Sequence, residues 1–184
     1  MDWQALQGIH PRSYMCGHCG NKVGSNRGWH TSNHSPTVVA VYVCPLCFKP
    51  SVFLHGSQFP GVAPGQPVEN LPTDVEQLYS EARVAVAANA NTAAVLTCRK
   101  LLMNVAVSQG AAPGQSFVAY VEHLSSAGYI PPNGRAWVDH IRKKGNEATH
   151  EIQVMSRADA EELIAFSEML LKFVYEFPAR VPAP

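Results

Sequence analysis

The sequence predicts a mainly α-helical protein in which a small N-terminal β unit precedes a bundle of about five helices. Three observations lead to this expectation. Two Cys-x-x-Cys pairs and short β-branched runs occupy the first third, a stretch rich in proline and glycine follows, and apolar residues then recur at helical spacing. We therefore expect a β unit over residues 1–56, a linker over 57–72, a helical bundle over 73–177 and a tail over 178–184.

Composition and charge narrow the class of protein. The 184 residues suffice for one medium domain or two small ones. The 14 basic residues balance 14 acidic ones, so no overall basic field indicates nucleic-acid binding, although a local basic patch can exist in a neutral protein. The chain has no apolar run of about 18 residues, and because its first twelve residues lack an apolar core behind a basic end, we expect no secretory signal. We expect a cytoplasmic protein without membrane contact, whose cysteines are reduced.

The first third carries the pattern of a zinc ribbon. Two Cys-x-x-Cys pairs, with 24 residues between them, supply four thiolates: Cys16, Cys19, Cys44 and Cys47. Four thiolates fill the tetrahedral shell of a zinc ion and leave no position for a catalytic water, so the expected zinc is structural. The β-branched runs 37–43 and 51–55 predict two short strands beside the second pair. Two disulfides are the alternative, which a reducing compartment disfavours.

The insert between the two cysteine pairs leaves two further questions open. His18, His30 or His34 could replace one cysteine as a ligand, although four thiolates already complete the set. Trp29, beside Arg27, could stack on a nucleic-acid base, or it could pack back onto the ribbon while its neighbours are solvated.

Helical periodicity starts after the linker. A capping box at Thr73–Glu76 opens the first helix, and the apolar pattern predicts helices over about 73–90, 91–109, 115–127, 135–151 and 156–176. Cys98 lies among apolar neighbours and is expected to be a core residue rather than a nucleophile. Arg99 is either a solvated side chain or a second cation for a nucleic-acid site.

The predicted helix over 135–151 carries the candidate functional site. A step of four residues turns a helical side chain by only about 40°, so Arg142, Asn146 and His150 share one face. Histidine can transfer a proton near neutral pH, arginine can bind the charge that develops on a phosphate, and Asn146 can orient either group. Lys143 and Lys144 could attract a nucleic-acid backbone. The same side chains could instead be structural helix neighbours that offset the helix dipole.

The motifs of the helical part resemble a known family. The sequence IRKKGNEATH at 141–150, preceded by CRKLL from Cys98 and by LP and EAR further upstream, resembles the domain-of-unknown-function family 4145 over roughly residues 70–177. That family is similar to the HEPN superfamily of helical bundles, which are often dimeric and occur in restriction, abortive-infection and toxin systems. Many HEPN members are metal-independent ribonucleases with an arginine and a downstream histidine at a dimer interface.

The resemblance implies a HEPN-like bundle, a homodimer, and Arg142 and His150 as a catalytic pair. RNA and a protein of a restriction or toxin system are the implied partners. Two hypotheses follow. The chain is a metal-independent ribonuclease or RNA-binding protein of a bacterial defence, toxin or restriction-associated system, or it is a non-catalytic dimeric module that binds nucleic acid or protein. A zinc-dependent hydrolase is disfavoured because four thiolates close the metal shell.

Overall fold

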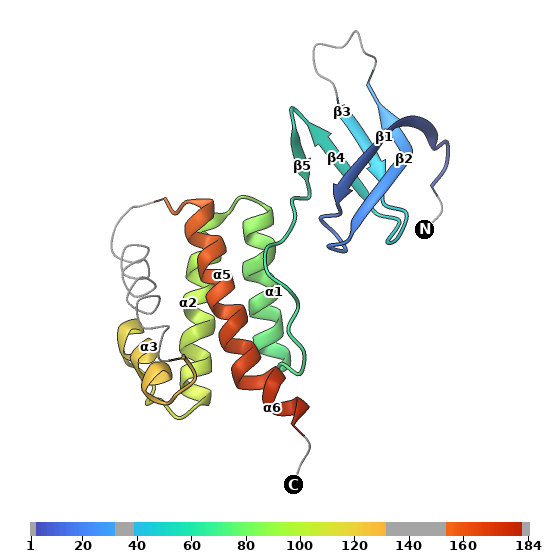
Figure 1. Ribbon diagram of the computed structural model, residues 1–184. Helices are drawn as coiled ribbons and strands as arrows, with labels where there is room; N and C mark the ends of the chain where they lie inside the picture. Colours follow the sequence, from blue (N-terminus) through green and yellow to red (C-terminus); the bar gives the residue numbers. More distant parts are fainter. Residues whose placement is uncertain (1–2, 32–38, 132–153, 182–184) are drawn as a thin grey trace. The chain divides into compact units, whose positions relative to one another are not determined.

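The computed structural model describes residues 3–31, 39–131 and 154–181. The chain divides into two compact units, Met1–Ala63 and Pro64–Pro184 (Figure 1). The division falls within the stretch rich in proline and glycine. None of the described helices combines the length and apolar character that a membrane crossing requires.

The first unit is an antiparallel sheet in which each strand pairs with the next along the chain. Its strands are β1 (Gln7–Met15), β2 (Lys22–His30), β3 (Val39–Val43), β4 (Pro50–Leu54) and β5 (Ser57–Phe59). Tyr14, Tyr42 and Phe53 form a tilted and edge-to-face aromatic cluster on its buried side. Ile9, Val23 and the buried cysteines complete this small core.

Gly28 sets the point at which β2 meets β3. The two strands pair only over residues 28–30 of β2, and a Cβ on Gly28 would lie 1.8 Å from the carbonyl oxygen of Val41. Only glycine permits so close an approach. From Gly28 towards its start, β2 remains paired with β1 but not with β3. The stretch Gly24–Arg27 therefore has a sheet partner on one side only.

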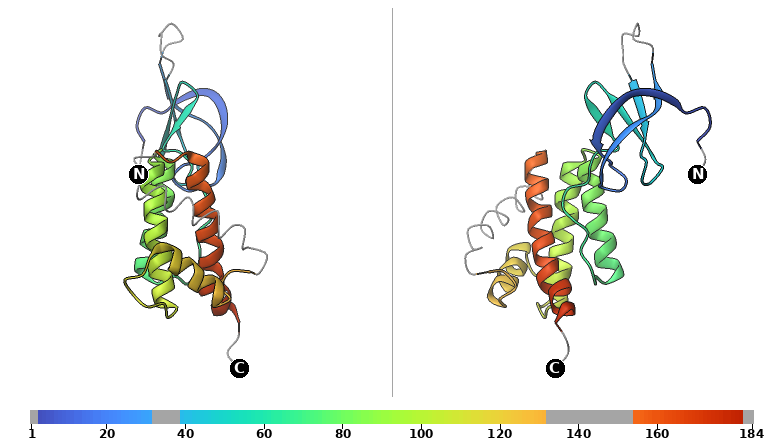
Figure 2. Two further views of the ribbon diagram at one scale, coloured as in Figure 1. Left: turned by 90° about the vertical axis from the view of Figure 1, so that its left-hand side faces the viewer. Right: turned by 45° about the vertical axis from the view of Figure 1, so that its right-hand side comes forward.

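The described residues of the second unit hold four helices of at least ten residues. These are α1 (Thr73–Ala87), α2 (Asn91–Ser108), α3 (Phe117–Ser126) and α5 (Arg157–Leu171). A π-helical turn, η2 (Lys172–Glu176), and a short helix, α6 (Phe177–Arg180), continue α5. Helices α1, α2 and α5 lie side by side in all views, and α3 packs against α2 (Figures 1 and 2).

The predicted fold class is wrong in two respects. The N-terminal region is a five-stranded sheet rather than two short strands, because the short β5 and the two long strands, β1 and β2, were not anticipated. Glycine, proline and asparagine interrupt β1 and β2, and most of their side chains are exposed, so neither shows the alternation that marks a strand. Four helices of at least ten residues, not five, lie in the described residues; the range 135–151, where a further helix was expected, lies outside them.

The helix starts differ in how well they follow the sequence signals. The predicted start of α5 is confirmed, since Ser156 and Asp159 form a complete capping box. The predicted capping box of α1 is wrong. Pro72 occupies the N-cap position, no side chain caps the helix, and the Glu76 N–H donates to the Pro72 carbonyl oxygen at 2.9 Å. A proline there fixes the backbone of the entering chain in place of a side-chain cap.

Residues 64–72 form a strap along the helical unit (Figure 1). Arg83 of α1 donates from Nε to the Pro64 carbonyl oxygen and from Nη2 to that of Gly65, both at 2.8 Å. The carboxylates of Glu168 and Glu176 accept the N–H groups of Gln66 at 2.9 Å and Glu69 at 3.1 Å, respectively. The strap is therefore held by side chains from α1, α5 and η2.

Candidate metal centre

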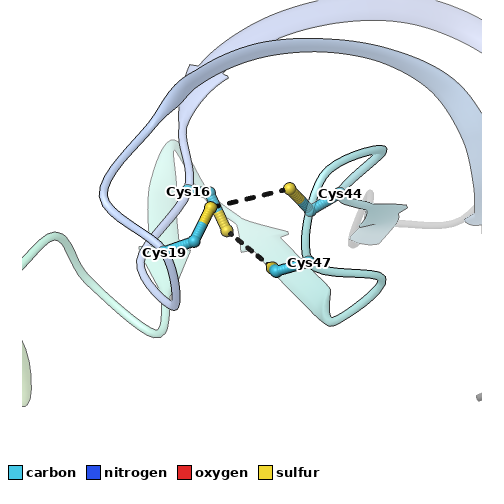
Figure 3. Close-up of side chains that lie close together, drawn as sticks. All are labelled: Cys16, Cys19, Cys44 and Cys47. Atoms are coloured by element: carbon cyan, nitrogen blue, oxygen red, sulfur yellow. Dashed lines mark hydrogen bonds between the residues drawn. The ribbon is translucent and has the colours of Figure 1, made fainter.

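Four cysteine side chains meet between two turns of the sheet unit (Figure 3). Cys16 and Cys19 come from the β1–β2 turn, and Cys44 and Cys47 from the β3–β4 turn. All four Sγ atoms lie within 4.8 Å of one another. The distance is 3.7 Å between the Sγ atoms of Cys16 and Cys47 and 3.9 Å between those of Cys19 and Cys44. The cluster could hold a metal ion.

These distances fit metal ligands rather than disulfides. Thiolates placed tetrahedrally at about 2.3 Å from a zinc ion would be about 3.8 Å apart. A disulfide requires about 2.05 Å between its sulfur atoms, and all four cysteines are free thiols. The disulfide alternative is therefore wrong.

The two turns share one backbone form, which presents both pairs of thiols in the same way. The Gly20 N–H donates to the Cys16 carbonyl oxygen at 2.8 Å, and the Phe48 N–H donates to the Cys44 carbonyl oxygen at 3.0 Å. Gly20 and Phe48, each one residue after the second cysteine of its pair, have φ values of 70° and 58°. The first position is a glycine, as this left-handed conformation favours; the second is a phenylalanine.

The environment shifts the thiol pKa values in opposite directions. A backbone hydrogen bond at Asn21 lowers the pKa of Cys19 to about 7. Burial raises the pKa of Cys47 to about 12 and raises that of Cys16 above its ordinary value. Since a cysteine ligates a metal as the thiolate, metal binding at this centre must displace protons from the buried thiols.

His18 and His30, two of the three histidines proposed as alternative ligands, do not join the cluster. His18 Nε2 lies 2.9 Å from the Pro50 carbonyl oxygen, and His30 Nδ1 lies 2.7 Å from that of Thr31. Within the described residues, the group that could hold a metal consists of the four cysteines alone. His34 lies outside those residues.

The predicted catalytic and nucleic-acid-binding stripe is not described by the structure. Its members lie in the range 132–153, outside the described residues: Arg142, Lys143, Lys144, Asn146 and His150. Their predicted roles therefore stay predictions.

Arg99, the remaining predicted cation, is described. Only 9% of Arg99 is exposed, its Cζ lies 4.3 Å from the ring centroid of Phe117, and burial lowers its pKa. Its Nη1 has no hydrogen-bond partner in the part of the chain that the structure describes. The expectation of a solvated surface arginine is wrong, because the side chain lies between α2 and α3 rather than in water.

Cys98 is a buried core residue of α2, as predicted. Burial raises the pKa of its thiol to about 12. An ordinary cysteine in the unfolded chain titrates near pH 8.5. A proton held more tightly in the folded state stabilises that state fully below the unfolded pKa, and this contribution is lost as the pH rises towards 12.

We therefore expect the melting temperature of the helical unit to fall as the pH rises from about 9 to 11. In the Cys98→Ala variant the melting temperature should fall less steeply with pH. Part of the fall should remain in this variant, because burial also raises the pKa of Tyr79. Circular dichroism at 222 nm across this pH range measures both curves. Identical pH dependence in the two proteins would contradict the role given to Cys98.

A cysteine-rich sheet and a separate helical unit define a two-unit protein whose sheet unit carries a candidate metal centre. The chain belongs to the family described as a domain of unknown function, DUF4145, whose model matches residues 80–183, more than half of the sequence. The family expected from the sequence is thus confirmed. No curated protein and no solved structure shows a significant match. The matched range excludes the metal centre and includes the segment 141–150.

Proposed function

We propose that this protein is a metal-independent ribonuclease or RNA-binding protein of a bacterial defence, toxin or restriction-associated system. In this proposal the helical unit is related to HEPN bundles, the protein acts as a cytoplasmic homodimer, and the sheet unit holds a structural zinc ion. The observation that carries the proposal is the Arg142, Asn146 and His150 pattern at four-residue spacing inside the segment that the family model matches.

The metal centre supports a structural rather than catalytic role for zinc. Thiolates favour zinc over harder cations such as magnesium, and a set of four completes its shell. Zinc bound there would cross-link the β1–β2 turn to the β3–β4 turn. Reaction chemistry would then come from side chains elsewhere in the chain, and the Arg142, Asn146 and His150 set supplies suitable groups.

The proposed reaction uses the RNA itself as the nucleophile. The 2′-oxygen attacks the adjacent phosphorus, the bond from phosphorus to the 5′-oxygen breaks, and a cyclic phosphate and a 5′-hydroxyl result. His150 would move a proton at the 2′-hydroxyl or at the leaving oxygen. Arg142 would bind the charged phosphate oxygens, and Asn146 would orient the imidazole or the phosphate. A partner protein of a restriction or toxin system would direct or restrain the activity.

The test is cleavage of single-stranded RNA in magnesium-free buffer that contains EGTA. We expect His150→Ala to lower the cleavage rate by about 10²–10⁴-fold, the usual contribution of a proton-transfer residue. His140→Ala is the matched control, because the same substitution falls in the same segment but off the proposed face. Absence of cleavage by the wild-type protein, or wild-type cleavage by His150→Ala, would contradict the ribonuclease proposal.

The burial of Arg99 favours a second candidate function. An expected cation of the nucleic-acid site lies between α2 and α3, where it contacts Phe117 rather than a ligand from solvent. In a non-catalytic dimeric module that binds nucleic acid or protein, polar side chains such as Arg99 would contact neighbouring helices instead of a reacting phosphate. For such a module, His150→Ala lowers the melting temperature and no turnover exists to be lost.

A further inference from the structure

A hollow of about 420 Å³ lies beside the metal centre within the sheet unit. It opens where β2 is no longer paired with β3, between Gly24–Arg27 on one side and Val43–Pro45 on the other. The Ser25 hydroxyl donates to the Val43 carbonyl oxygen at 2.8 Å and joins the two sides. Its volume falls in the range of about 300–1,000 Å³ that is usual for ligand sites.

Two aromatic side chains line this hollow. The Trp3 indole N–H donates to the Phe48 carbonyl oxygen at 2.6 Å, and the Trp3 ring packs edge-to-face on Trp29 with ring centroids 5.6 Å apart. The Trp29 indole N–H in turn donates to the Ala5 carbonyl oxygen at 3.1 Å. Trp29 thus packs on the sheet unit, whereas Trp3 lines the hollow.

Phe48 is the more exposed of the two aromatic side chains that line the hollow. It is 56% exposed although it belongs to a turn that carries two metal ligands. Its ring is absent from the buried aromatic cluster of Tyr14, Tyr42 and Phe53. A large apolar ring that contributes little to the core is available to stack on a planar ligand.

The polar residues around the hollow favour a polyanion. Asn26 and Arg27 line it, and a second hollow of about 260 Å³ shares Gly24, Ser25 and Asn26 with it and adds Arg12. Among the residues that the structure describes, no acidic side chain lines either hollow. Residues 1–63 contain four lysines and arginines and one aspartate, so they carry a basic excess that a tetrathiolate zinc centre offsets only in part.

We infer that the Trp3–Phe48 hollow binds a base of a single-stranded nucleic acid, with the flanking phosphates at Arg27 and Arg12. Stacking on aromatic rings combined with backbone contacts from cations is the usual way to bind single strands. The inference deepens the proposed function and rests on it for the choice of nucleic acid as ligand. It gives the sheet unit the role of holding the strand, separate from the proposed chemistry in the helical unit.

Fluorescence anisotropy with a labelled eight-nucleotide thymidine DNA tests this inference on the zinc-loaded full chain. DNA lacks the 2′-hydroxyl, so it cannot be cleaved by the proposed reaction. Phe48→Ala should weaken binding about 10-fold, within the range reported for the loss of one base stack. Leu46→Ala is the matched control, because Leu46 lies in the same turn, is 60% exposed and does not line the hollow. The affinity of this variant for the DNA should be unchanged.

A second variant tests the cation independently of the metal turn. Arg27→Gln should weaken binding and reduce the slope of log affinity against log salt by about 0.7, the contribution of one phosphate contact on a single strand. If Phe48→Ala fails to retain zinc, the Arg27→Gln measurement still tests whether the hollow binds the strand. Equal affinities for wild type, Phe48→Ala and Arg27→Gln, or no binding by the wild type at millimolar protein, would overturn the inference.

The two proposals fail in distinguishable ways. If Phe48→Ala weakens DNA binding but the wild-type protein cleaves no RNA, the base-binding hollow stands and the ribonuclease proposal falls. If RNA cleavage depends on His150 but Phe48→Ala and Arg27→Gln bind DNA as the wild type does, the ribonuclease stands and the hollow does not bind the strand.

Discussion

Removal of a metal ion bound at the four-cysteine centre, as proposed above, is expected to unfold the sheet unit and to leave the helical unit folded. The sheet unit has a small core of which the buried cysteines are themselves a part. Structural zinc contributes about 10–16 kcal/mol of apparent binding free energy, more than a core of this size supplies. The helical unit has a separate core built from α1, α2, α3 and α5.

Metal analysis combined with limited proteolysis measures this effect. After treatment with a strong zinc chelator, cleavage should begin within residues 1–63, while the helical signal at 222 nm should persist. Cys44→Ser should behave as the chelated protein does because it removes one ligand. Cys98→Ala, which changes a cysteine outside the centre, should retain the metal and resist cleavage. A sheet unit that resists proteolysis equally with and without metal would contradict a structural role for the ion.

Truncation of Phe166 should cause the largest loss of stability in the helical unit. Phe166 lies on α5, is 0% exposed and is the largest fully buried side chain of the described core. A Phe166→Ala change removes buried apolar surface and leaves a cavity that the neighbouring helices fill only in part, which costs about 3–5 kcal/mol.

Phe173→Ala provides the matched control for that prediction. Phe173 lies in η2, is 43% exposed and contacts Phe177 edge-to-face, so its truncation should cost less than about 1 kcal/mol. Chemical denaturation followed at 222 nm gives both free energies of unfolding. Equal losses for the two variants would mean that Phe166 does not occupy the centre of the core.

The features predictable from the sequence were those with a local chemical signature. Cysteine spacing predicted the cluster, and the Ser156–Asp159 pattern predicted the start of α5, since each depends on residues a few positions apart. Strands β1 and β2 have no such signature. Their pairing depends on the close approach at Gly28 and on a bulge between Gly8 and Arg12, neither of which alternation reveals.

The candidate base-binding hollow was equally hidden from the sequence. Trp3 and Phe48 are 45 residues apart in the sequence and are joined by the hydrogen bond from the indole N–H to the Phe48 carbonyl oxygen. Trp29, beside Arg27, packs back onto the sheet unit, which is one of the two alternatives that the sequence left open, and it contacts Trp3 instead of lining the hollow. A tryptophan near the N-terminus gives no local sign of such a partner.

The strap over residues 64–72 also ties together distant parts of the chain. The amides of Gln66 and Glu69 donate to carboxylates 102 and 107 residues further on, so their hydrogen bonds close loops that span almost the whole helical unit. Such closure carries a chain-entropy cost that is recovered only after α1 and α5 have assembled. Solvent exchange of these two amide protons thus reports directly on the meeting of the first and last helical segments.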